Sequence, residues 1–125
     1  MQFEHDISIQ VETAYIEAQS TPEENQYAFS YTITIHNTGD EPARLLRRHW
    51  VITDANGKVE EVSGEGVVGE QPYLKPGEAF RYTSGAMLDT PVGSMEGEYA
   101  MVDDEGREFL APIPPFSLAV PNKLH

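Results

Sequence analysis

Residues 27–36 read YAFSYTITIH, and they alternate between large apolar and small or polar side chains more regularly than any other stretch. The tyrosines, the phenylalanine and the isoleucines stand at the odd positions, from Tyr27 to Ile35. Smaller or polar residues such as Thr32 and Thr34 lie between them. Successive side chains of a β-strand point to opposite faces of the sheet, so this period of two predicts a strand with one buried face. The residue types favour the same structure.

The same period of two recurs on both sides of this stretch. Residues 7–15 alternate in the same way, and residues 44–53 form a further expected strand that carries the only tryptophan, Trp50. The remaining strands are expected at 59–62, 76–82, 95–101, 107–111 and 116–120. Prolines at 112, 114 and 115 place the tail at a sheet edge or divide it into two kinked pieces.

Turn-forming residues separate these segments. Residues 21–25 form a polar break that disfavours a helix, and residues 37–40 and 103–106 have the composition of turns. Asn56-Gly57 predicts a hairpin with a type I′ turn, because that turn needs a positive φ at both central residues.

Together these strands predict a single all-β domain over residues 1–125. The expected fold is an immunoglobulin- or fibronectin type III-like antiparallel β-sandwich of about seven to eight strands. Trp50 lies in the third expected strand, where immunoglobulin-like domains bury their core tryptophan. The chain has no cysteine and therefore no disulfide behind that tryptophan, so the fibronectin type III variant fits better.

The composition narrows the possible partners. A formal net charge of −13 opposes binding to nucleic acid and favours a basic partner surface or a cation. The absence of cysteine excludes thiolate catalysis and cysteine-ligated metal sites. Residues 1–10 lack the pattern of a signal peptide, and no apolar run reaches membrane-spanning length, so we expect a cytoplasmic protein without membrane insertion.

Residues 64–69, GEGVVG, have the glycine spacing of dinucleotide-binding loops. Those loops lead directly into a helix whose N-terminus meets the pyrophosphate, whereas here Pro72 disfavours a helix at Gln71. A Rossmann site is therefore excluded. Two interpretations stay open: a structural crossing loop, or a flexible loop that contacts phosphate or a partner's backbone beside an arginine.

The only concentration of basic side chains lies just before the tryptophan. In a regular strand Arg48 shares the face of Leu46 and Trp50, whereas Arg47 and His49 point the other way. An arginine on a buried face could stack on an aromatic ring, extend to the strand edge or pair with a buried carboxylate. The pattern is open between a structural ion pair or strand bulge and an arginine that binds an anion or carboxylate.

No arrangement of side chains predicts catalysis or a metal centre. The histidines are widely separated, and residues 54–57 lack the length and final glutamate of a calcium loop. The acidic side chains of residues 103–105 could hold a hard cation weakly, but an ordinary hairpin turn explains them better. Ser84 lies outside any nucleophile-elbow pattern. We expect no enzymatic activity, no cofactor and no metal.

Five strings in a fixed order carry a resemblance to a known family: Arg48-His49-Trp50, GEGVVGEQP at 64–72, PGEAFRYTSG at 76–85, GSMEGEY at 93–99 and IPPFSL at 113–118. Through them essentially the whole chain resembles the ApaG family. The resemblance implies a fibronectin type III-like β-sandwich and a bacterial gene linked with cobalt resistance and magnesium efflux. Related domains occur in a eukaryotic F-box protein and a polymerase-interacting protein, which implies a protein-binding module.

The leading interpretation is a non-enzymatic module that binds an unknown protein partner. Its link to ion efflux is then indirect, because no segment crosses a membrane. The alternative is a binder of a phosphate-containing small molecule, such as a nucleotide or pyrophosphate. The candidate ligand-binding residues are Gly64, Gly66, Gly69, Arg47, Arg48 and His49.

Overall fold

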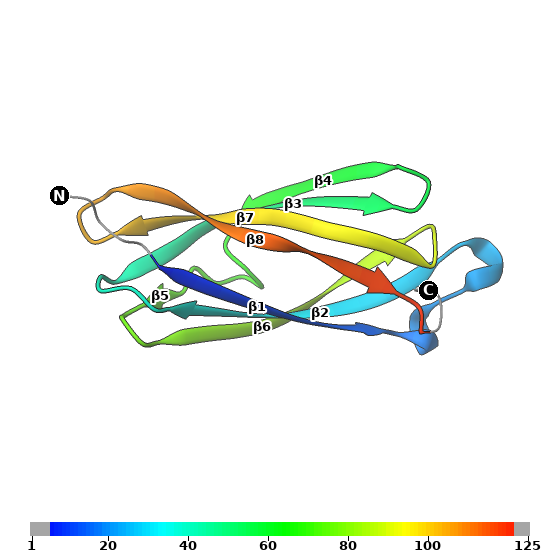
Figure 1. Ribbon diagram of the computed structural model, residues 1–125, viewed down its shortest axis with the longest axis horizontal. Coiled ribbons are helices and arrows are strands. Elements are labelled where there is room, and N and C mark those ends of the chain that lie inside the picture. Colours follow the sequence, from blue (N-terminus) through cyan, green and yellow to red (C-terminus); the bar gives the residue numbers. More distant parts are fainter. Residues whose placement is uncertain (1–5, 122–125) are drawn as a thin grey trace.

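The computed structural model describes residues 6–121 as two β-sheets packed face to face (Figure 1). Two single turns of 3-10 helix, η1 and η2, lie between the first two strands. The elements are β1 (Ile7–Tyr15), η1 (Glu17–Gln19), η2 (Pro22–Glu24), β2 (Tyr27–Asn37), β3 (Ala43–Asp54), β4 (Val59–Glu65), β5 (Tyr73–Leu74), β6 (Ala79–Leu88), β7 (Val92–Asp103) and β8 (Glu108–Ala119). The antiparallel β-sandwich of eight strands confirms the fold expected from the sequence, and its immunoglobulin- or fibronectin-like ancestry stays a prediction.

The two sheets differ in width. The smaller sheet has the order β1-β2-β6, and the larger has the order β4-β3-β7-β8, with short β5 paired to β3. Every pairing is antiparallel. Val62 of β4 pairs with Trp50 and shares its inward side, yet Val62 is 40% exposed whereas Trp50 is 2% exposed. The smaller sheet therefore leaves the inward side of β4 uncovered.

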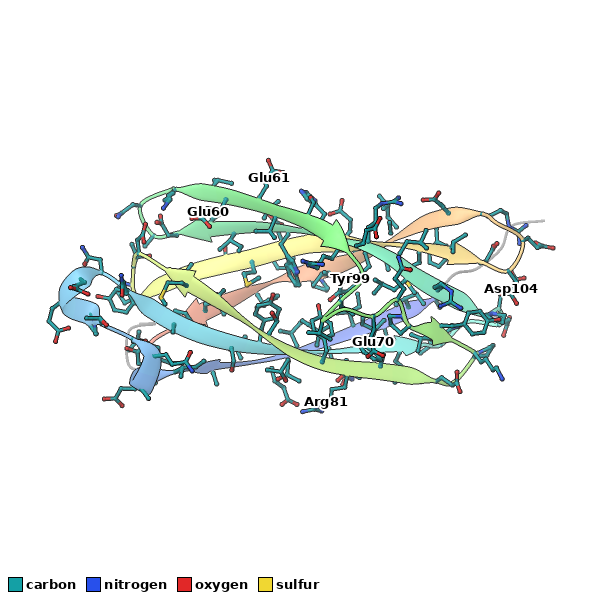
Figure 2. The ribbon with its side chains drawn as sticks, turned by 180° about the vertical axis from the view of Figure 1, so that it is seen from behind. Glu60, Glu61, Glu70, Arg81, Tyr99 and Asp104 are labelled. Atoms are coloured by element: carbon teal, nitrogen blue, oxygen red, sulfur yellow. The ribbon has the colours of Figure 1, made fainter. Side chains whose placement is uncertain are left out.

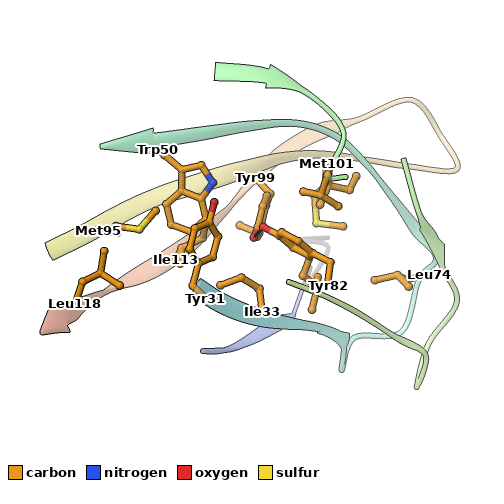
Figure 3. Close-up of a cluster of buried hydrophobic side chains, with 14 of the residues drawn as sticks. Tyr31, Ile33, Trp50, Leu74, Tyr82, Met95, Tyr99, Met101, Ile113 and Leu118 are labelled. Carbon is orange, nitrogen blue, oxygen red and sulfur yellow. Dashed lines mark hydrogen bonds between the residues drawn. The ribbon is translucent and has the colours of Figure 1, made fainter. Parts of the chain in front are cut away.

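Trp50 stands at the centre of the core, as expected. The tryptophan ring meets the rings of Tyr31, Phe116 and Tyr99 at centroid distances of 5.3, 5.9 and 6.4 Å, in edge-on geometry. Figure 3 shows Tyr31 and Tyr99 beside Trp50. These aromatic residues come from both sheets, so the contacts join the two layers. Edge-to-face aromatic pairs stabilise a core beyond the area that they bury, by about 0.5–1.5 kcal/mol each.

The strand bulge that the sequence left open in β3 is confirmed, so the face shared by Leu46 and Trp50 in a regular strand is not observed. Leu45 pairs with Met101 and Arg47 with Ala100, so Leu46 is an extra residue that forms a β-bulge. The bulge shifts the alternation by one position. Leu45, rather than Leu46, is therefore fully buried on the same side as Trp50. A regular strand could not bury both, because five positions separate them.

The hairpin between β3 and β4 is confirmed, but the expected type I′ turn is wrong. Gly57 has a φ of 84°, whereas Asn56 has no positive φ. The turn is held instead by Asp54, whose Oδ1 accepts the backbone N–H groups of Asn56 at 2.8 Å and Lys58 at 3.0 Å. A side chain that satisfies two turn amides thus replaces the backbone geometry that Asn-Gly suggested.

The turn expected at residues 103–106 is confirmed and has the same design. Asp103 accepts the backbone N–H groups of Glu105 and Arg107, each at 3.0 Å. Both turn aspartates are buried, so these bonds also satisfy their carboxylates. The tail that follows is a single strand, β8, at the edge of the larger sheet. It confirms the edge position that its prolines predicted. The strand is continuous, but its register with β7 shifts at Pro114 and Pro115.

Candidate binding surfaces

The ordinary alternation of β3 directs the side chains of the expected site residues to both sides of the larger sheet. Beyond the bulge Arg48 points inward with Trp50, whereas Arg47 and His49 point outward. Four of the expected residues nevertheless line one hollow on the outward side: Arg47, Arg48, His49 and Gly64. Arg48 also lines a second recess with Gly69 and donates a hydrogen bond to the Gly66 carbonyl.

His49 is held between two carboxylates on the outward side. Its Nδ1 lies 2.9 Å from Glu98 Oε2, and its Nε2 lies 2.9 Å from Glu61 Oε1. An ionised carboxylate only accepts hydrogen bonds, so both contacts are satisfied together only when both ring nitrogens carry a proton. Hydrogen bonds to Glu98 and then to Glu61 raise the pKa of His49 above its ordinary value of 6.5.

The outward side of β4, β3, β7 and β8, which we call the outer face, carries a shallow hollow. Its members include Arg47, His49, Glu98, Ala100, Leu110 and Pro112. Leu110 is 64% exposed, although Leu is a side chain that folding usually buries. Arg47 reaches Glu108 at 2.9 Å, in an exposed ion pair. Figure 2 shows Glu61 projecting from β4 away from the smaller sheet. An acidic side chain therefore lies beside the apolar hollow.

On the inner side, the guanidinium of Arg48 is bound by backbone carbonyl groups rather than by a carboxylate. Its Nη1 donates to the carbonyl oxygens of Glu65 at 3.1 Å and Gly66 at 3.0 Å. Its guanidinium lies so close to Gly64 that a Cβ there would come within 2.8 Å of Nη1 and Nη2. Within residues 6–121 no carboxylate pairs with Arg48, so a structural ion pair does not explain this arginine.

The glycine-rich loop turns tightly between the two sheets (Figure 1). Val67 is fully buried in the core, and it exchanges two backbone hydrogen bonds with Glu70, at 2.8 and 2.9 Å. Val68 and Gly69 at the tip have φ values of 42° and 80°, as the two central residues of a type I′ turn would. Gly66 donates its N–H to the Leu46 carbonyl at the bulge, at 2.8 Å. Three loop amides are therefore already used inside the protein.

Between this loop and β6 lies a recess, which we call the Arg48 recess. It is lined by Tyr31, Arg48, Val67, Val68, Gly69, Tyr82 and Ser84. At its inner end the hydroxyls of Tyr82 and Tyr99 lie 2.5 Å apart. Burial raises the pKa of Tyr82 to about 12 and that of Tyr99 further still, so both hydroxyls stay protonated at neutral pH.

Metal binding finds no support in this geometry. In the part of the chain that the structure describes, no three His, Asp or Glu side chains are placed to share one ion. The two carboxylates beside His49 approach different ring nitrogens, so they do not converge on a common point.

Sequence reasoning missed several members of both surfaces. Glu61, Glu98 and Leu110 come from three other strands, and only the register of the larger sheet brings them beside His49. Ser84 was considered only as a possible nucleophile, yet it lines the Arg48 recess together with Tyr82. One signal was available for Leu110. It is a large apolar residue at an outward position of β8, between the more buried Phe109 and Ala111.

These features define the class of the protein: a small antiparallel β-sandwich of two sheets with a recess beside its glycine-rich loop. The sequence profile described as the ApaG domain matches residues 17–103. The chain therefore belongs to the ApaG family, which confirms the resemblance found in the sequence.

Individual members of this family are similar to the chain over nearly its whole length. The chain is similar to Protein ApaG of Methylococcus capsulatus, with 56% identity over 121 residues, which covers 97% of this chain and 96% of the relative. It is also similar to Protein ApaG of Stenotrophomonas maltophilia, with 59% identity over 119 residues and coverage of 95% and 94%. A crystal structure assigned to the ApaA protein of Bordetella pertussis is 49% identical, covers 94% of this chain and 96% of its own, and has a TM-score of 0.92.

Gly66→Val should lower the stability of the unliganded protein. Gly66 has a φ of 66°, and a Cβ there would overlap the Glu70 carbonyl oxygen. A branched residue in this conformation costs on the order of 1–3 kcal/mol, before any clash is counted. Urea unfolding followed by far-UV circular dichroism measures the change.

Gly69→Asn is the matched control. Gly69 has a φ of 80°, but no atom lies within 4 Å of a Cβ built there, and asparagine tolerates this conformation. It should unfold close to wild type. Equal stability of Gly66→Val and wild type would show that the loop does not serve as a structural crossing.

The pKa of His49 should lie above 6.5 in an NMR titration of its ring protons. Because the folded pKa is raised, the ion pairs of His49 stabilise the fold fully below about pH 6.5 and are lost as the pH rises through the folded value. Glu98→Gln should lower the pKa most, and Glu61→Gln less, whereas Glu96→Gln is a control on the same face without a bond to His49. A wild-type pKa at or below 6.5 would contradict the double contact.

Proposed function

We propose that this protein is a non-enzymatic interaction module that acts in the cytoplasm and binds a basic protein partner on the outer face. The observation that carries the proposal is Leu110, a large apolar side chain that is 64% exposed beside Ala100 and Pro112. A leucine gains about 1.5–3 kcal/mol when it is transferred from water to an apolar contact. A partner that covers Leu110 would gain that free energy.

The charge of the outer face favours a basic partner. Glu61, Glu96 and Glu98 project on this side around His49, and Glu108 lies beyond them. Arg47 and protonated His49 offset only part of this charge, in a chain with a net charge of −13. Acidic side chains around an apolar centre resemble the polar rim and apolar core of protein interfaces. They would also accelerate encounter with a cationic surface.

The edge of β8 indicates which part of the protein makes the contact. Pro112, Pro114 and Pro115 have no N–H, so this strand offers few donors for an added β-strand. Side chains on the sheet face, rather than backbone at the edge, are therefore the proposed contact.

The link with cobalt resistance and magnesium efflux, which the family resemblance implies, is proposed to be indirect. Within residues 6–121 no helix has the length and apolar character needed to cross a membrane. The partner, rather than this chain, would then act on the ion.

A second candidate function is the binding of a phosphate-containing small molecule. The glycine loop itself supports it weakly, since the amides of Gly66, Val67 and Glu70 donate to carbonyl oxygens. The supporting observation is instead Arg48, whose guanidinium has no carboxylate partner among the described residues. Calorimetry with nucleotides and pyrophosphate, with and without magnesium, tests this candidate against the first.

Leu110→Ser should weaken partner binding by about tenfold or more, because the variant forfeits the transfer of a leucine side chain. Affinity capture with the wild-type chain identifies the partner, and surface plasmon resonance then gives the dissociation constants of the wild type and the variant. Higher salt should weaken the complex, since the proposed contact is partly electrostatic.

Met87→Ser is the matched control. Met87 is also an exposed apolar side chain, at 50%, but it lies on β6 in the smaller sheet. It should bind like wild type. A partner that binds Leu110→Ser as tightly as wild type would place the interface elsewhere and overturn the proposal.

A further inference from the structure

We propose that the Arg48 recess binds a small oxyanion: the carboxylate or phosphoryl group at the end of a larger ligand. The proposal deepens the second candidate function and does not depend on the outer face. In this site the anion is bound by side chains from β2, β3 and β6, rather than by the loop amides that the sequence suggested as donors.

The guanidinium of Arg48 is positioned and only partly used. Nη1 makes both of its hydrogen bonds, to the carbonyl oxygens of Glu65 and Gly66, whereas Nε and Nη2 make none within residues 6–121. The group is half-buried and rests against Gly64, so few other orientations are open to it. A guanidinium held in this way retains donors in a fixed plane, which suits carboxylate and phosphate oxygens.

Neutral donors lie on the same recess. The Ser84 hydroxyl makes no hydrogen bond with any described residue. In the Tyr82–Tyr99 pair one hydroxyl donates to the other, so one of the two protons is left without a partner there. These groups can donate to an oxyanion that Arg48 holds.

A buried donor points to the same region. Trp50 Nε1 is buried and has no hydrogen-bond partner in the described chain, which is rare for a native polar group. The ring of Trp50 packs edge-on against the ring of Tyr31, with 5.3 Å between their centroids, and Figure 3 shows the indole nitrogen on the side of Trp50 that faces Tyr99. Since Tyr31 also lines the Arg48 recess, a bound oxygen or an accompanying water would find donors at its inner end.

The size and charge of the recess limit the ligand. Its volume is about 190 Å³, roughly that of six water molecules in the liquid, so it accepts a head group rather than a whole nucleotide. No acidic side chain of residues 6–121 lines it, although the chain as a whole is strongly acidic. The remainder of the ligand would leave past Val68, which is exposed at the loop tip.

The test is an NMR titration of the full chain with inorganic phosphate and, separately, with acetate. Saturable shifts should appear at the Gly69 amide, the Ser84 amide and the Arg48 Nε–H group. Ser84→Ala removes one neutral donor and should weaken binding about two- to tenfold. Arg48→Lys keeps the charge but loses the planar fork, and should weaken it more. The anion that binds more tightly identifies the ligand as a phosphate or a carboxylate.

Two controls separate this proposal from the interaction function. Arg47→Ala removes a neighbouring arginine from the outer face, and Leu110→Ser removes the proposed partner contact; both should bind the anions like wild type. If Arg48→Lys does not fold, as judged by circular dichroism, Ser84→Ala alone decides. The proposal is overturned if neither anion gives saturable shifts in the recess up to about 50 mM, or if Ser84→Ala binds like wild type.

Discussion

The β-bulge at Leu46 is the constraint on which the rest of the structure depends. It lets one strand bury both Leu45 and Trp50, which an uninterrupted alternation would place on opposite faces. The carbonyl of Leu46 accepts the Gly66 N–H at 2.8 Å and the Gln71 side-chain amide at 3.0 Å, so the bulge also anchors the glycine-rich loop. Core packing and loop position thus follow from a single extra residue.

Beyond the bulge, the ordinary alternation of β3 directs neighbouring side chains to two different surfaces. Arg48 faces the recess between the sheets, and His49 faces the acidic outer side, although they are neighbours in the chain. The proposed partner contact and the proposed ligand site therefore use different side chains. The exposed Leu110 supports an interaction module, whereas the guanidinium of Arg48, which pairs with no carboxylate within residues 6–121, supports a small oxyanion ligand. Membership of the ApaG family is compatible with both.

The fold was largely predictable, because strand periodicity is a local property and β2 displays it without interruption. The position of Trp50, the edge position of β8 and the 103–106 turn followed from residue types alone. The two surfaces were harder to predict, because they depend on the register between strands. No local pattern in the sequence indicates that Glu98 lies opposite His49. The turn at Asn56-Gly57 was misjudged because the carboxylate of Asp54 outweighed the backbone preference of the dipeptide.

Deleting Leu46 tests the role of the bulge most directly, with Leu46→Ala as a control that keeps the extra residue. Without it, either Leu45 or Trp50 must face outward, which costs about 3–5 kcal/mol of core packing. In a domain of this size, that loss corresponds to a fall in the melting temperature of roughly 10–20 °C. The account predicts such a fall for the deletion and a melting temperature close to wild type for Leu46→Ala. A deletion variant that melts at or above the wild-type temperature would contradict it.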